Sequence, residues 1–207
     1  MPTTYAHYKF GKEVLSALPR PLQNSIEAHR ELFDIGLHGP DILFYYNALK
    51  KDPVNEQGHT LHEQFADEFF HHAVEVIENA KDPAAARAYI YGFICHFALD
   101  SECPYVEKIM QVGRVSHNEI EMELDRMMLT EDYHDPLRYL TAKHIQPKME
   151  YAEVIAPFFK DVTAEQIYKA LKGMVFYHKL FLAPTSGKRK ALFLGMKAVG
   201  KYDSLHD

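Results

Sequence analysis

The stretch that decides the fold is residues 89–127, YIYGFICHFALDSECPYVEKIMQVGRVSHNEIEMELDRM. It contains two pairs in which an imidazole precedes a carboxylate by four positions, His96 with Asp100 and His117 with Glu121. Side chains four residues apart on a helix share one face, a turn apart, so each pair could reach a single cation. The sequence around the first pair is apolar, and burying an uncompensated carboxylate there would be strongly unfavourable. A metal ion or another fixed positive charge would remove that penalty.

The rest of the chain also favours helices. It has 207 residues, only 10 glycines, and 47% hydrophobic residues, which is ample for a core. Long stretches carry apolar residues with the period of a helix, and runs of β-branched residues are few. No repeat, low-complexity tract or linker divides the chain. We therefore predict an all-α protein, a multi-helix bundle that forms a single domain over residues 1–207.

Prolines, glycines and capping residues place the ends of the expected helices. These helices cover residues 5–18, 22–37, 42–49, 59–79, 83–103, 117–128, 136–145, 148–159, 164–182 and 191–199. Between them we expect a polar loop over residues 50–58 and a basic turn over residues 187–190. We expect that turn to be solvated, although three cations there would contribute ~3 kcal/mol at an anionic membrane.

Composition narrows the possible functions. The formal net charge is −6 and the pI is about 6.1, so no stable complex with nucleic acid is expected. Thirteen histidines favour metal binding or acid–base chemistry. Two cysteines, Cys95 and Cys103, are too few for a disulfide framework. We see neither a signal peptide nor an apolar run near the ~20 residues of a transmembrane segment, so a cytoplasmic location is expected.

Further histidines and acids stand at helix starts. His7 falls in the first turn of the first helix, Asp41 follows the rigid pair Gly39-Pro40, and His59 and His62 open the helix expected from residue 59. Nitrogen and carboxylate ligands suit zinc, which is typically four-coordinate and keeps one position open for water in catalytic sites. A single buried histidine is more often a satisfied core residue, but the whole set in one helical chain favours a metal centre.

The order of these residues resembles the zinc-dependent phospholipase C and S1/P1 nuclease superfamily. The phrases GPDILFYYN, GFICHFALDSECPYV and SHNEIEMELD are similar to its bacterial, phospholipase C-like branch. The resemblance covers about residues 1–130 well and is only general beyond them. It is carried by His7, Gly39-Pro40-Asp41, Gly58 with His62, His96 with Asp100, and His117 with Glu121.

This resemblance implies an all-helical fold with a cleft in which three zinc ions hydrolyse phosphodiesters. Asp41, His62, His96 and Asp100 would then hold one zinc. Asp100 would bridge to a second zinc, shared with His7 and the N-terminal amine, and His117 with Glu121 would hold a third. Zinc lowers the pKa of bound water toward ~7 and stabilises charge on attacking and leaving oxygens. Asp41 is also a catalytic candidate, because it could orient or deprotonate the attacking water.

The chain departs from the family's pattern at two ligand positions. The third zinc normally has a second histidine six residues after the bridging aspartate, and that position is Val106 here. Cys103 could replace it, although a plain buried cysteine is the simpler interpretation. The family's secreted enzymes use a mature N-terminal residue as a ligand, whereas this sequence begins Met1-Pro2. We therefore expect one to three zinc ions, and whether His59 replaces His62 stays open.

The expected function is a metal-dependent hydrolase of phosphodiester bonds that acts on a small phosphodiester or a phospholipid head group. One alternative is a non-enzymatic helical module that a metal stabilises through a degenerate site. Another is a His-Asp type phosphohydrolase that uses His134 and Asp135, although N-capping of a helix at Pro136 explains Asp135 more simply.

Overall fold

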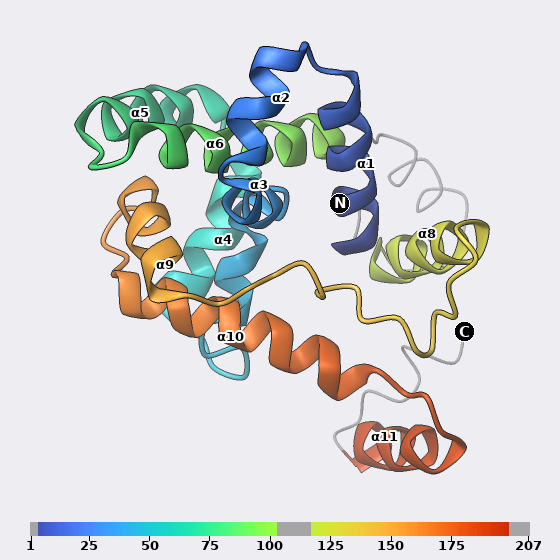
Figure 1. Ribbon diagram of the computed structural model, residues 1–207. Coiled ribbons are helices and arrows are strands. Elements are labelled where there is room, and N and C mark those ends of the chain that lie inside the picture. Colours follow the sequence, from blue (N-terminus) through green and yellow to red (C-terminus); the bar gives the residue numbers. More distant parts are fainter. Residues whose placement is uncertain (1–3, 103–116, 199–207) are drawn as a thin grey trace.

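The computed structural model describes residues 4–102 and 117–198, and all regular structure within them is helical (Figure 1). The predicted all-α class is confirmed. The elements are α1 (Thr4–Ala17), α2 (Arg20–Glu27), α3 (Arg30–Gly36), the 3₁₀-helix η1 (Gly39–Tyr45), α4 (Pro53–Glu63), α5 (Ala66–Asn79), α6 (Pro83–Ser101), α8 (His117–Glu131), α9 (Met149–Ile155), the 3₁₀-helix η2 (Ala156–Phe158), α10 (Ala164–Phe181) and α11 (Ser186–Ala198). None of the described helices is long and apolar enough to cross a bilayer.

Helix α6 is the element against which most others pack. Its start is fixed by Asp82, whose carboxylate accepts hydrogen bonds from the backbone nitrogens of Ala84 and Ala85, both at 3.0 Å. Helix α3 lies in direct backbone contact with it, because a Cβ at Gly36 would come within 2.1 Å of the Tyr89 carbonyl oxygen. Any side chain at that position would force the two helices apart.

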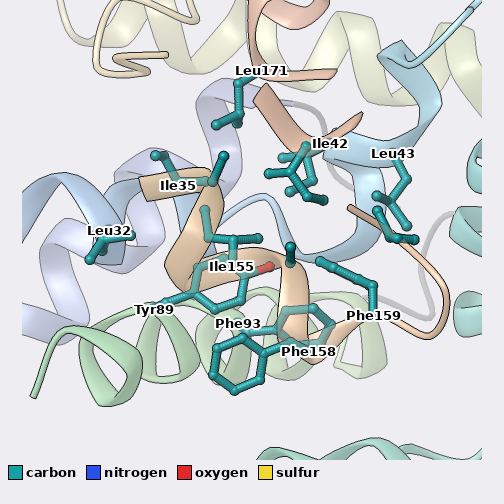
Figure 2. Packing of buried hydrophobic residues seen from close by; sticks show 14 of the residues in the cluster. Leu32, Ile35, Ile42, Leu43, Tyr89, Phe93, Ile155, Phe158, Phe159 and Leu171 are labelled. Carbon is teal, nitrogen blue, oxygen red and sulfur yellow. The ribbon is translucent and has the colours of Figure 1, made fainter. Parts of the chain in front are cut away.

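The main core fills the space between α6 and the elements that face it. Figure 2 shows Tyr89 and Phe93 of α6 near Phe158, with Ile35, Ile42, Leu43, Ile155 and Leu171 on the other side of the cluster. Full burial of a side chain of this size contributes about 1.5–3 kcal/mol. A second cluster joins α1, α2 and α3 to the far side of α6 through Leu15, Ile26, Phe33, Leu37 and Cys95.

Helices α1, α6, α8 and α10 agree with the expected ranges within a few residues at each described end. The single helix predicted over residues 22–37 is wrong, because the chain bends between α2 and α3 at His29, whose φ of −132° is not helical. The bend lets Ile26 join the second cluster while Leu32 and Ile35 join the main core.

The expected loop at residues 50–58 and helix at 59–79 are also wrong. Helix α4 begins at Pro53, because the Asp52 carboxylate accepts a hydrogen bond from the Val54 nitrogen at 3.0 Å and the Asn55 side chain accepts one from the Asp52 nitrogen at 3.1 Å. The helix then breaks before α5 at residues 64–65. The expected α-helix at residues 42–49 is instead the earlier 3₁₀-helix η1.

Three corrections concern the C-terminal part of the chain. Residues 136–145 form turns rather than a helix, and the Asp135 carboxylate accepts a hydrogen bond from the Leu137 nitrogen at 2.9 Å. The helix expected over residues 148–159 is the shorter α9 followed by η2. The residues expected as a basic turn, 187–190, belong to α11, which begins at Ser186 and not near residue 191.

The irregular segment before α9 is anchored by a buried histidine pair. The Nε2 atoms of His38 and His144 lie 2.7 Å apart, so one ring donates a hydrogen bond and the other accepts it. Tyr8 stacks on His144 with ring centroids 3.9 Å apart. Burial lowers the pKa of His144 to about 3 and that of His38 well below its ordinary value, and neighbouring imidazoles add to both effects. Both rings are therefore neutral in the folded protein.

Acid should destabilise the protein through this pair. Each imidazole titrates near pH ~6.5 in the unfolded chain but resists protonation when folded, so below that pH the unfolded state binds more protons. For His144, the free energy of unfolding in urea should fall by about 1.4 kcal/mol per pH unit as the pH drops toward about 3, and His38 should add to the fall in the same direction. His144→Gln keeps a partner for His38 without titrating and should show a shallower dependence. Parallel pH curves for the two proteins would contradict the assignment.

Candidate metal centre

Five predicted side chains from four elements converge on one place. The Asp100 carboxylate is their shared neighbour: its Oδ1 lies 3.4 Å from His7 Nε2, and its Oδ2 lies 3.1 Å from His96 Nε2 and 3.8 Å from His62 Nε2. The fifth member, Asp41, places Oδ1 3.1 Å from His62 Nε2. His7 and His96 are buried, with 1% and 2% of their side chains exposed.

Helix α1 holds His7 in place with help from another helix. The carboxylate of Asp125 in α8 accepts hydrogen bonds from the backbone nitrogens of Tyr5 and Ala6, each at 2.9 Å. These nitrogens belong to the first turn of α1, which has no intrahelical acceptor for them. The charge also suits the positive end of the helix dipole. His7 follows directly and stacks on the His96 ring, with centroids 4.3 Å apart.

The turn before Asp41 requires glycine. Gly39 has a φ of +46°, and a Cβ there would lie 2.2 Å from Cδ2 of His96. The chain therefore passes directly over the imidazole at Gly39, the first residue of η1. The Asp41 nitrogen then donates to the His38 carbonyl at 2.9 Å, which closes the turn and directs the carboxylate toward His62.

Helix α4 fixes the proton of His62. Its Nδ1 lies 2.7 Å from the carbonyl oxygen of Gly58, one turn earlier in the same helix. Because a carbonyl can only accept, Nδ1 carries a proton, and Nε2 is the nitrogen that faces Asp41 and Asp100 and could bind a metal ion. Metal-binding histidines commonly have their tautomer set in this way.

Burial and neighbouring charges shift the pKa values of three side chains in the cluster. Burial opposes ionisation of Asp100, but the neighbouring His7 and His96 outweigh it and hold its pKa far below the usual range. Burial, together with the nearby His96, lowers the pKa of His7 despite Asp100 beside it. Burial also opposes protonation of His62, yet the adjacent Asp41 carboxylate prevails and raises its pKa.

The cluster passes a simple test of fit for a metal ion. Despite the short separations, several of its buried atoms have no hydrogen-bond partner: both ring nitrogens of His7 and of His96, Nε2 of His62, and Oδ1 of Asp41 and of Asp100. Buried polar atoms are nearly always satisfied. Among the described residues, two groups have ligand atoms within 4.8 Å of one another, His7 with Asp41 and His96, and His62 with His96 and Asp100. Each could hold a metal ion.

The remaining predicted ligands are not in these groups. Glu121 is a buried residue of α8, 7% exposed, on the same helix face as Asp125. The side chain of His117, the first residue of α8, lies outside the described residues, as do Met1, Cys103 and Val106. His59 packs its ring on Phe44, with centroids 4.5 Å apart, whereas His62 faces both carboxylates.

The His134-Asp135 pair has other partners. His134 stacks on Tyr139 with centroids 4.3 Å apart, and Asp135 caps the turn that follows it. Neither residue belongs to a group of described residues that could hold a metal. Nothing in the described geometry favours the His-Asp phosphohydrolase alternative.

A large apolar cleft, for which the sequence gives only an ambiguous signal, lies next to Phe44 and Tyr45. Its volume is about 1050 Å³, and Phe44 connects it to the cluster, since the Phe44 ring lines the cleft and lies 5.6 Å from the His62 ring. Other walls come from Tyr45 of η1, Met122 and Leu129 of α8, Leu137, and Tyr177, Phe181 and Leu182 at the end of α10. The only signal in the sequence is the run of aromatic residues after Asp41, which is equally typical of a core.

Comparison with known families agrees with this geometry. A model described as zinc-dependent phospholipase C matches residues 6–173, which include all five converging side chains. Comparisons with curated proteins and with solved structures find no match. The match extends well past the N-terminal part that carries the resemblance in the sequence. The chain therefore belongs to the zinc-dependent phospholipase C family.

Proposed function

We propose that this protein is a zinc-dependent phosphodiester hydrolase and that the cluster around Asp100 is its metal centre. The observation that carries the proposal is the convergence of buried imidazole nitrogens and carboxylate oxygens that lie close together without hydrogen-bonding one another. Membership of a zinc-dependent family supports the choice of metal, and so does the donor set, since zinc binds histidine nitrogen and carboxylate oxygen.

Two zinc positions suit the two sides of Asp100. Its Oδ2 faces His62 and His96, and its Oδ1 faces His7. A carboxylate whose oxygens face different histidines is suited to bridge two ions. Asp41 would complete the position shared with His62. A third ion held by His117 and Glu121 remains a prediction from the family pattern.

Different residues of the cluster would have different roles in hydrolysis. When bound, zinc supplies a water of lowered pKa and a Lewis acid for the phosphoryl oxygens. Asp41 is the candidate general base, because its carboxylate is 21% exposed and stands at the edge of the cluster, where it could orient the attacking water and accept its proton. Buried His7 and His96 keep solvent from the opposite side.

The cleft favours a lipid substrate over a soluble one. Its walls are largely apolar, and one of them, the Phe44 ring, lies 5.6 Å from the His62 ring. A phosphodiester bound at the cluster would therefore have apolar surface available for a hydrocarbon chain. We propose that the substrate is a phospholipid whose head group is released, in keeping with the family.

Metal binding should depend on His62 and not on its neighbour. The His62→Ala variant removes a nitrogen that faces both carboxylates, whereas His59→Ala removes an exposed ring three residues earlier. At zinc 100-fold above the dissociation constant, wild type and His59→Ala should gain about 2.7 kcal/mol in the free energy of unfolding over the chelated protein. His62→Ala should gain much less. Zinc content is measured after dialysis. Equal zinc content in the two variants would show that His62 is not a ligand of the metal.

Turnover should require Asp41 and the central pair. We expect Asp41→Asn to lower hydrolysis of a chromogenic phosphodiester by about 10²–10⁴-fold, the usual contribution of a general base. The His96→Ala/Asp100→Asn double variant should lose both metal and activity. Wild-type protein that binds zinc but hydrolyses neither phosphatidylcholine nor the chromogenic substrate would support the metal-stabilised module instead.

Gly39 offers a test of the local geometry. In Gly39→Ala the new methyl group would lie 2.2 Å from the His96 ring, and the positive φ would add about 1–2 kcal/mol of strain. Zinc content should fall sharply while the helical circular dichroism signal persists. Gly187→Ala is the matched control, because a Cβ there meets nothing within 4 Å, and it should keep its zinc. Full zinc retention by Gly39→Ala would contradict the structure at this turn.

A further inference from the structure

Helix α11 projects from the main body of the molecule. Figure 1 shows it beyond the end of α10, away from the helices that surround the core. Two of its apolar side chains are exposed, Leu194 at 69% and Phe193 at 43%. A Cβ at Gly195 would meet nothing within 4 Å, as at Gly187, so the helix is not packed closely at these two positions.

The end of α10 adds further exposed apolar side chains. Phe176 and Phe181 are each 58% exposed and Leu180 is 39% exposed. The start of α11 is fixed to this end, because Nζ of Lys188 donates to the carbonyl oxygen of Lys179 at 3.0 Å. We call the exposed residues of both helices the C-terminal surface: Phe176, Leu180, Phe181, Phe193 and Leu194. Exposed apolar side chains on two joined helices are typical of an interaction site.

The positive charge of α11 indicates which kind of partner could bind there. Residues 186–198 include Lys188, Arg189, Lys190 and Lys197 and contain no aspartate or glutamate. The whole chain, by contrast, has a net charge of −6. A short helix of an acidic protein that carries three consecutive cations, Lys188, Arg189 and Lys190, and no acid in its own sequence is complementary to a negatively charged partner.

We propose that the C-terminal surface binds an anionic lipid bilayer. Helices that combine lysine and arginine with exposed phenylalanine and leucine lie in the interface of such bilayers. A nucleic acid would use the cations but leave Leu194 and Phe181 exposed to water, whereas a bilayer accommodates both. Phe181 also lines the apolar cleft, so a bound bilayer would lie at the mouth of the cleft. This last point rests on the proposed function, but the binding itself does not.

Vesicle sedimentation tests the proposal directly. Zinc-free protein, which cannot turn over lipid, is mixed with vesicles of phosphatidylcholine alone or of equal parts phosphatidylcholine and phosphatidylglycerol. We expect sedimentation with the anionic vesicles only, and weaker binding as salt rises. Arg189→Glu/Lys190→Glu should weaken the partition by roughly 25-fold or more, since each cation near the surface contributes about fivefold. Leu194→Ser should weaken it without a change in charge.

The matched control is Lys81→Glu/Lys160→Glu, which makes the same change in charge at two exposed positions outside the C-terminal surface. It should bind as the wild type does, and equal weakening by both double variants would overturn the proposal. An absence of sedimentation with anionic vesicles would also overturn the proposal. The same holds if the α11 variants lose self-association or RNA binding while their vesicle binding is unchanged. Hydrolysis of a soluble chromogenic substrate should be the same in wild type and in the α11 variants. If wild type and all variants lack that activity while vesicle binding behaves as expected, the proposed hydrolase function is contradicted and the proposed binding of lipid by the C-terminal surface is supported.

Discussion

A buried negative charge at the end of α6 is the constraint on which the centre of this structure depends. Asp100 stands in the last turn of the helix, where the backbone dipole is itself negative and offers it no support. Asp41 brings a second carboxylate close by through His62. Of the imidazoles beside them, His7 resists protonation because burial lowers its pKa, whereas the adjacent Asp41 carboxylate raises the pKa of His62. Two carboxylates close together in a mostly buried site favour a bound cation, and a divalent metal ion would balance both charges.

Several contacts in the surrounding fold hold those side chains in place. The turn at Gly39 lets η1 pass directly over His96 and directs Asp41 inward. Asp125 caps α1 from a different helix and so fixes the position of His7. The Gly58 carbonyl sets the tautomer of His62. Each of these contacts orients a group that would bind a metal, and none of them adds appreciably to the buried apolar area. The arrangement is therefore explained better by a site than by packing.

The sequence predicts the side chains of the cluster better than the elements that carry them. His96 and Asp100 lie on one helix at a fixed spacing, so their proximity follows from local geometry alone. The break at residues 64–65 could not be seen in this way, because the apolar pattern continues through Phe65, which the structure leaves 91% exposed. The turns over residues 136–145 depend on His144 reaching His38, a contact across 106 positions with no local signal. By contrast, Asp52-Pro53 repeats the helix-start signal of Asp82-Pro83 and could have been recognised.

In helix α10 the helical pattern of apolar residues predicts burial correctly for only part of the helix. In its first half Ile167, Leu171 and Met174 are buried in the main cluster. The helical pattern of apolar residues continues to Phe181, but beyond Met174 several of them are exposed, Phe176 and Phe181 at 58% and Leu180 at 39%. From the sequence alone these later aromatic residues are expected to be core. Exposed apolar side chains of this kind are typical of interaction sites, so the continuation of the pattern past Met174 is consistent with the lipid-binding surface proposed above.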